Sequence, residues 1–544
     1  MKRYSLLTGG LLGGLSAFVV VAVNSIASQL VGLPRPEYIM FDWVSRNLPG
    51  NLLTFAIDTM VKVITSLNLG QTSTVAKMGE LTIAVLQFVV LGIIFGVVLA
   101  LLGRRYPNRL GMVGLVGGLL ISLPAIIIMP GLGVPPAGLF PSVLWIALVH
   151  LVWGWSLGSL IQFIGQPESE APGDLSRQQF LWLVGIGSFA VVVSAAGLSL
   201  LERGSTETAG TQPGGTQNMN EEAVANAATT SGEAQSPTQS QLNARIQPAP
   251  GTRPELTSND NFYRIDINAS PPVVNGDTWR LEVKGLVDNP LMLSLDEIKA
   301  MPSISQAITL ECISNPLGGD LTSSTRFTGV RLKDVLAQAG LQASVQEISI
   351  QAVDGFYESV PLSEAMDDRT LLVYDMNGLP LPVGHGFPLR IYIPNHFGMK
   401  QPKWIVSMEA IDHQGEGYWV DRGWSEEAIP PTTSVIDTVA VNDRDPQSGA
   451  VPVGGIAYSG ARGISKVEVQ IDNGDWVPAE LRDPPLSPLT WLQWRYSWPA
   501  QPGQHTIQVR AYDGSGTLQE TESNPPHPNG ATGIYSVRED ISSA

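Results

Sequence analysis

Long apolar stretches alternate with short polar loops over the first 204 residues of the chain. A helix needs about 20 apolar residues to cross the roughly 30 Å hydrocarbon core of a bilayer. The stretch 51–69 is also apolar, but Asp58 and Lys62 interrupt it, and this mixture predicts an amphipathic helix that lies on the membrane surface. The pattern predicts about five transmembrane helices, at approximately 5–31, 81–103, 110–130, 141–165 and 179–201.

Basic residues in the short loops predict the orientation of these helices. Lys2 and Arg3 precede the first span, and Arg104, Arg105 and Arg109 lie between the second and the third. Because such residues stay in the cytoplasm, a five-span path brings the rest of the chain out on the extracytoplasmic side. Two alternatives stay open: the first span is a cleaved signal, or the polar half remains in the cytoplasm because the sequence lacks a twin-arginine pair.

The pattern changes twice after the membrane region 1–204. Residues 205–250 are rich in Ser, Thr, Gly, Gln and Asn and have few large apolar side chains, so they predict a disordered linker. From 251 to 430 short strands alternate with short helices, as in 278–295, where a turn separates two alternating runs and Ser294 with Glu297 forms a helix-starting capping box. This domain is of the α+β class.

The last part of the chain, 431–544, consists of short alternating strands separated by turns such as Asn473-Gly474. Their number and spacing predict an immunoglobulin-like β-sandwich of about 100 residues. Trp476, Trp491, Trp494 and Trp498 are expected to be core or interface residues of this sandwich.

Charge and cysteine content restrict the chemistry. The net charge of −17 argues against a nucleic-acid partner. A lone cysteine excludes an internal disulfide framework, a Cys-rich zinc site, an all-Cys iron–sulfur cluster and covalent haem attachment through CxxCH. It leaves room for one thiolate ligand to a soft metal. That residue, Cys312, follows the β-rich run 308–310 and enters a loop rich in Asn, Pro and Gly; the alternative is an inert buried thiol.

Several separated sequence blocks, taken in order, resemble the molybdopterin domain of the sulfite oxidase family. They cover about 30% of the chain directly, counted over 262–424. The blocks are LECISN at 310–315, RFTGVRLKDVL at 326–336, VYDMNGLPLP at 373–382, HGFPLR at 385–390, KWIVSMEAI at 403–411 and YWVDRGW at 418–424.

The resemblance implies a molybdenum–molybdopterin cofactor and assigns residues to it. Cys312 matches the family's metal-binding cysteine, so it is the expected metal ligand. His385, Arg390 and Lys403 match the family's contacts to the pterin phosphate, where Arg supplies a fork of donors and Lys a point charge. Arg264, with Phe262 beside it, resembles the arginine near the metal's oxo groups.

Other positions depart from the family pattern. Leu317 stands where sulfite oxidases have a substrate-binding arginine, Trp424 stands where they have an active-site tyrosine, and Asp266 matches a histidine near the cofactor. Fewer cationic groups should weaken the binding of an oxyanion. Sulfite is therefore one candidate substrate, and an uncharged or larger molecule such as a sulfoxide is another. Arg264 and Trp424 are expected to border the substrate.

These observations together predict a membrane-anchored molybdopterin-dependent oxidoreductase that transfers an oxygen atom to or from a small molecule. Electrons would pass to or from a separate electron-transfer protein, because the chain has no haem or cluster motif. The resemblance of the C-terminal region also implies a homodimer, with a monomer as the alternative. A competing hypothesis is a non-enzymatic surface protein that is tethered to the membrane.

Overall fold

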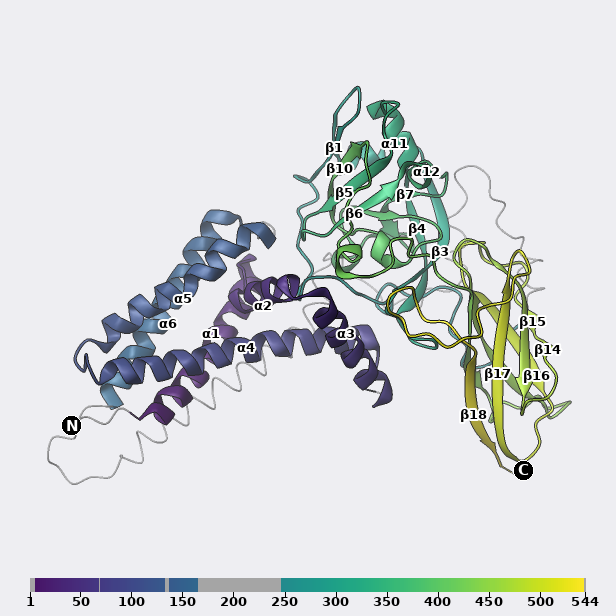
Figure 1. Ribbon diagram of the computed structural model, residues 1–544, viewed down its shortest axis with the longest axis horizontal. Coiled ribbons are helices and arrows are strands. Elements are labelled where there is room, and N and C mark those ends of the chain that lie inside the picture. Colours follow the sequence, from purple (N-terminus) through teal and green to yellow (C-terminus); the bar gives the residue numbers. More distant parts are fainter. Residues whose placement is uncertain (1–4, 68, 133–136, 165–245, 543–544) are drawn as a thin grey trace, which may run out of the picture.

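The computed structural model describes residues 5–67, 69–132, 137–164 and 246–542. The fifth expected span, 179–201, and most of the expected linker 205–250 lie outside these residues. The described helices α1, α4, α5 and α6 are long and apolar enough to cross a membrane, as the sequence predicted. The helical region, shown at the left of Figure 1, consists of α1 (Leu6–Val31), α2 (Pro36–Asn47), α3 (Gly50–Ser66), α4 (Thr72–Gly103), α5 (Leu110–Leu132) and α6 (Leu139–Ile164).

Helix α4 begins at Thr72, nine residues before the expected start at 81. Lys77 and Glu80 lower the hydropathy of the first part of the helix, so a search of the sequence for long apolar stretches does not include it. In the fold Lys77 is only 6% exposed and is surrounded by oxygen atoms of the central region. Helix α3 coincides with the stretch expected to form an amphipathic helix.

Glycines facing each other bring the long helices together in two antiparallel pairs. In the first pair, Gly9 and Gly13 of α1 lie against Gly96 and Gly92 of α4, and a Cβ atom at Gly13 would collide with the carbonyl oxygen of Gly92. The second pair, α5 with α6, uses the same spacing. Small residues four positions apart allow helix backbones to approach closely within a membrane. The second pair involves Gly114, Gly118, Gly154 and Gly158.

The central region contains two five-stranded sheets, drawn in teal and green (Figure 1). In the first sheet, of order β2-β1-β10-β5-β6, only the β1–β10 pair is parallel. In the second, of order β3-β4-β7-β8 with β9 beside β7, all pairs are antiparallel. The first sheet is formed by β1 (Arg280–Gly285), β2 (Leu291–Ser294), β5 (Glu347–Ala352), β6 (Tyr357–Pro361) and β10 (Ile405–Ile411). The second is formed by β3 (Ser303–Glu311), β4 (Thr322–Arg331), β7 (Leu371–Met376), β8 (Leu379–Pro380) and β9 (Arg390–Tyr392).

Short helices complete the central region. The expected capping box is present at the start of α10 (Leu295–Lys299), and α11 (Leu332–Ala339) ends at Gly340, whose φ of 70° suits a glycine. The other helical segments are α12 (Leu362–Ala365), η1 (Val383–His385), η2 (Gly398–Lys400) and η3 (Val420–Arg422).

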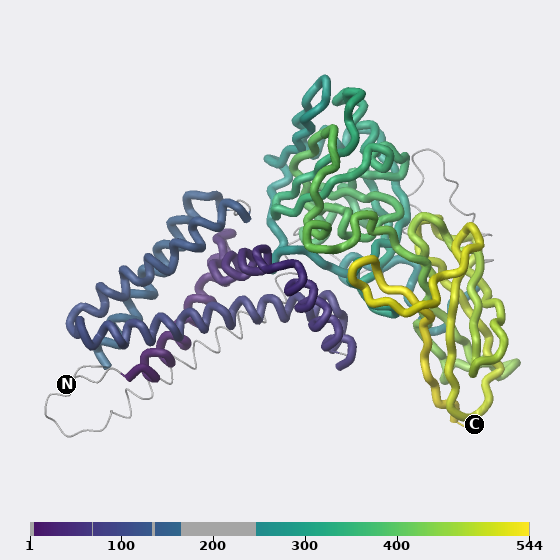
Figure 2. The backbone as a smooth tube through the Cα atoms, viewed as in Figure 1, coloured from purple at the N-terminus to yellow at the C-terminus, as the bar shows by residue number. Residues whose placement is uncertain are grey.

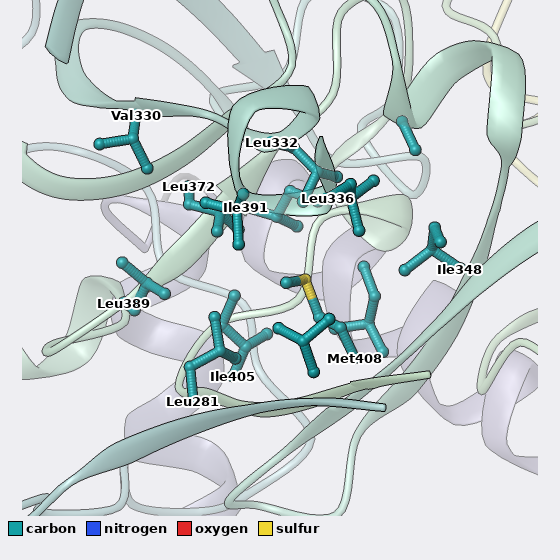
Figure 3. Packing of buried hydrophobic residues seen from close by; sticks show 14 of the residues in the cluster. Leu281, Val330, Leu332, Leu336, Ile348, Leu372, Leu389, Ile391, Ile405 and Met408 are labelled. Atoms are coloured by element: carbon teal, nitrogen blue, oxygen red, sulfur yellow. The ribbon is translucent and has the colours of Figure 1, made fainter. Parts of the chain in front are cut away.

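The second sheet has a hydrophobic core on each face. Leu372 of β7 packs into the core shared with α11 and the first sheet (Figure 3), whereas its neighbours Leu371 and Val373 pack into a core that contains Phe262. Successive side chains of a strand point to opposite faces of the sheet, so the continuous apolar run 371–374 contributes side chains to the cores on both faces. The second core holds the end of β3 and therefore fixes the position of Cys312.

The C-terminal region contains two four-stranded antiparallel sheets, of order β11-β12-β16-β15 and β14-β13-β17-β18. Both sheets contribute side chains to one core around Trp494, which is fully buried. Figure 2 shows a loop before β18, in yellow, that runs back against the central region. The strands are β11 (Thr433–Val439), β12 (Val451–Tyr458), β13 (Ile464–Ile471), β14 (Val477–Pro478), β15 (Glu480–Leu481), β16 (Leu492–Trp498), β17 (Gly503–Asp513) and β18 (Tyr535–Ile541).

Candidate active site

One cavity of about 930 Å³ lies between the central region and the helices α2, α3 and α4. Arg264 is not among the residues that line it, but it forms an ion pair with Asp266, which does line it. The fold therefore brings together residues that lie up to 162 positions apart in the sequence. The expected site residues that line the cavity are Phe262, Cys312, His385, Arg390, Lys403 and Trp424.

Cys312 is the first residue after β3, as the sequence predicted. Its backbone N–H donates to the carbonyl oxygen of Leu321 at 2.9 Å, and its Sγ lies 3.1 Å from Oγ of Ser314. Asn315 shapes the loop, because its side chain donates to Glu311 and accepts from the N–H of Leu321. Burial raises the pKa of the Cys312 thiol, so a metal would have to displace its proton.

A second side of the cavity is basic. Arg390 is 3% exposed, and its Nη1 donates to the carbonyl oxygen of His385 at 3.1 Å, while its Nε has no partner among the residues that the structure describes. Burial, followed by the charges of Lys403 and Arg390, lowers the pKa of His385 to about 3. Burial likewise lowers the pKa of Arg390 to about 10. This side of the cavity therefore has cationic groups that an anion would stabilise.

Asp266 is the counter-charge of these cations. Its carboxylate lies 3.4 Å from Nζ of Lys403 and 3.3 Å from Nε of Arg264. Burial alone would raise its pKa, but the charges of Lys77, Lys403 and Arg264 hold the pKa well below the usual range. The sequence marked Asp266 only as a departure from a family pattern; the structure places it at the centre of a buried charge cluster.

Lys77 comes from helix α4, outside the region that the sequence associated with the site. Its Nζ lies 3.1 Å from the Asp266 carboxylate and donates to the carbonyl oxygens of Asp266 and Asn268, at 2.9 and 2.8 Å. Helix α2 adds further contacts: Asp42 accepts from the N–H of Ala269 at 2.9 Å, and Arg46 donates to Asn268. The helical region thus holds the segment 266–269 from one side.

Trp424 lies beside the cavity and is 5% exposed, in one cluster with Ile313, Phe397 and Met399. The loop before β18 covers Trp424. The ring of His527 in this loop lies 4.9 Å from the ring of Trp424, and the backbone N–H of Ser425 donates to the carbonyl oxygen of Pro528. The indole N–H of Trp424 has no partner in the described part of the chain. Sequence reasoning did not connect the C-terminal region with this residue.

Leu317 lies elsewhere. Its side chain packs against Val435, Ile456, Tyr458 and Trp491 of the C-terminal region, and it does not line the main cavity. The position that matches a substrate arginine in the family therefore contributes to an interface within this chain.

Comparisons with known proteins assign the central region to a family. Residues 268–419 match the family model described as an oxidoreductase molybdopterin binding domain. Mitochondrial sulfite oxidase of Homo sapiens is 29% identical over 315 residues, which cover 49% of this chain and 57% of the human protein. The uncharacterized oxidoreductase YuiH of Bacillus subtilis is 30% identical over 152 residues, covering 28% of this chain and 75% of that protein.

The crystal structure of the sulfane dehydrogenase SoxCD from Paracoccus pantotrophus aligns with a TM-score of 0.46 and 19% identity, over 58% of this chain and 97% of that one. The chain spans little more than half of the human sulfite oxidase that it matches. The family model and the names of the relatives agree on an oxidoreductase, and the family model names molybdopterin as the bound group. The chain belongs to the sulfite oxidase family and is an oxidoreductase with a molybdenum–molybdopterin cofactor.

Proposed function

We propose that the protein is a membrane-anchored molybdenum oxidoreductase that transfers an oxygen atom to or from a small molecule. The observation that carries this proposal is the cavity in which Cys312 meets His385, Arg390 and Lys403. The chain belongs to an oxidoreductase family, and this argues against the alternative of a non-enzymatic surface protein.

The residues suit both the metal and the phosphate of the cofactor. Cys312 lines the cavity, and a thiolate suits a soft metal. Arg390 offers an Nε–H that has no partner within the described ranges, and Lys403 has a pKa of about 8, because burial lowers it more than Asp266 raises it. A dianionic phosphate would stabilise both charges and would compete with Asp266 for Lys403.

When bound, the cofactor would supply the two-electron oxygen-atom transfer, while the protein supplies binding, orientation and exclusion of water. Trp424 would close the substrate side and would donate its indole N–H, which has no partner in the part of the chain that the structure describes, to a substrate oxygen. Arg264, with 31% of its side chain exposed, would border the substrate position from beside the cavity, to which its ion pair with Asp266 connects it. Leu317 stands where sulfite oxidases have a substrate-binding arginine, and it packs against the C-terminal region instead of lining the cavity. The substrate position therefore has fewer cations to bind an oxyanion, so we favour an uncharged S-oxide over sulfite.

We further propose four parts: a membrane region 1–204, a linker 205–250, a molybdopterin domain 251–430 and an immunoglobulin-like sandwich 431–544 that pairs with a second copy. Arg104 and Arg105 follow the C-terminal end of α4, and this end of the helix lies away from the central region (Figure 1). Basic loops stay in the cytoplasm, so the catalytic domain would be extracytoplasmic. The chain then has to cross the bilayer once more between 164 and 246, and the apolar stretch 179–201 meets that requirement.

The proposal is tested on the full chain in detergent by measuring molybdenum and pterin content together. We expect about one molybdenum per chain, and loss of the metal in Cys312→Ser with most of the pterin retained, because only the thiolate bond is removed. Ser305→Ala, at an exposed position of the same strand, is the matched control and should keep both. Full molybdenum and activity in Cys312→Ser would reject the site. Protease protection in intact cells decides which side the catalytic domain faces.

A further inference from the structure

The cavity extends beyond the residues expected to hold the cofactor. It continues between the helices α3 and α4, where its walls are apolar side chains such as Met60, Ile64, Val75 and Ile83. Among the residues of α2, α3 and α4 that line it, Glu80 alone is ionisable. A catalytic pocket that served only water-soluble substrates would have no need of this apolar extension.

The apolar extension is open to the outside. Phe55, Val63 and Ile83 line the cavity and are 69%, 45% and 53% exposed, so they surround its mouth. Helix α4 has 32 residues, or about 48 Å, whereas a bilayer core of about 30 Å takes about 20 of them. If the C-terminal part of α4 fills the bilayer, roughly the first twelve residues extend beyond it. The mouth at Ile83 then lies at the edge of the hydrocarbon core.

We infer that this mouth admits a membrane-dissolved quinone, which exchanges electrons directly with the cofactor bound in the cavity. The inference rests on the proposed membrane placement and on the proposed cofactor site. The isoprenoid tail would lie along α3 and α4, and the ring would enter toward Trp419 and Trp424, which line the inner cavity. The indole N–H of Trp424, for which no described residue is a partner, is a suitable donor to a quinone carbonyl.

A quinone fits better than a soluble cytochrome for two reasons. The sequence of this chain has one cysteine, and His150 is the only histidine before residue 385, so it offers no His pair for a haem between its helices. Electrons must therefore leave on a separate carrier. A soluble carrier docks through charged and polar groups, whereas the mouth is apolar and faces the proposed bilayer.

The exchange balances with water as the oxygen source. In the oxidising direction, substrate, water and quinone give the oxygenated substrate and quinol. Water gives its oxygen atom to the substrate and its two protons to the quinone oxygens, and the two electrons lost by the substrate reduce the quinone. In the reverse direction quinol reduces an S-oxide and water is released. Substrate and quinone use the same cavity, so they should bind alternately.

The test blocks the passage without touching the site. A Cβ atom at Gly79 would lie 3.9 Å from Sδ of Met60, so a larger side chain can be built there and would narrow the space between α3 and α4. The variant is Gly79→Phe, and the control is Leu120→Phe, at a position on α5 that is 60% exposed. Binding of a decyl-substituted benzoquinone to the molybdenum-loaded full chain is followed by tryptophan fluorescence, with molybdenum content measured on the same samples.

We expect Gly79→Phe to weaken quinone binding about tenfold or more, with normal molybdenum content, while Leu120→Phe binds as the unaltered protein does. Reduction of the loaded metal centre by dithionite should stay unchanged in both variants, since a small ion does not need the apolar passage. Equal binding by both variants, or no quinone binding by a fully loaded protein, would overturn the inference and leave the proposed function intact. A protein that never holds molybdenum would instead refute the proposed function.

Discussion

The ammonium group of Lys77 and the carboxylate of Asp266 form an ion pair of 3.1 Å between helix α4 and the base of the active-site cavity. The side chains of both residues are nearly inaccessible, at 7% and 1% exposure. Asp266 also contacts Lys403, a proposed phosphate ligand. The helical region therefore takes part in the electrostatics of the candidate cofactor site, in addition to its proposed role as an anchor.

Lys77→Met should loosen the cofactor and the contact between the two regions. Breaking a buried pair by removing one partner costs about 3–5 kcal/mol, because the other charge stays buried. Asp266 would then draw Lys403 and Arg264 closer and leave less charge for the phosphate. We expect faster loss of pterin during dialysis and a lower melting temperature. Lys62→Met, at an exposed position of α3, is the control, and equal pterin loss in both variants would contradict the proposed coupling.

Asp42→Asn should change how stability depends on pH. Burial raises the pKa of Asp42 to about 7, so the folded protein holds a proton that the unfolded chain releases near pH 4. The stabilisation from this group is complete below the unfolded pKa and is lost as the pH rises through about 7. The asparagine can still accept from the N–H of Ala269. Between pH 4 and 8, the melting temperature should therefore fall less steeply with rising pH in the variant than in the unaltered protein. The same dependence on pH in both proteins would refute the assignment.

Arg390→Lys should reduce cofactor retention although the charge is kept. A lysine cannot offer the forked pair of donors, and a hydrogen bond to a charged group is worth about 1.5–3 kcal/mol. We expect the pterin affinity to fall about tenfold or more, as measured by reconstitution of the cofactor-free protein. Arg280→Lys, at an exposed position of β1, is the control and should reconstitute normally.

Gly13→Leu should separate helices α1 and α4. The added side chain would collide with the backbone of Gly92, and over-packing of this kind costs about 1–3 kcal/mol. We expect a lower melting temperature in detergent, with little change in pterin content, since the contact lies within the helical region. Leu11→Phe, at a position that is 60% exposed, should behave as the unaltered protein does. A stable Gly13→Leu protein would show that the close approach is dispensable.

Local patterns in the sequence account for much of the fold. Alternation predicted the strands on either side of the turn before β2, and the apolar stretches predicted α1, α4, α5 and α6. The end of β3 at Glu311 places Cys312 in a loop, as the sequence indicated. These features depend on neighbouring residues, so the periodicity of hydrophobic side chains is enough to predict them. The glycine spacing of the helix pairs was also visible in the sequence, and it gives the signal for their contact.

What the sequence alone determined is the class of domain and the cofactor, because ordered blocks of residues carry that information, and the same blocks name the thiol and the basic residues as candidates for the site. Only the tertiary structure decided that α2, α3 and α4 form a wall of the cavity, that Lys77 reaches Asp266 from 189 positions away, and that the loop with His527 covers Trp424. Such contacts follow from how whole regions pack against each other, and a lysine at the edge of an apolar helix does not reveal which distant carboxylate it meets.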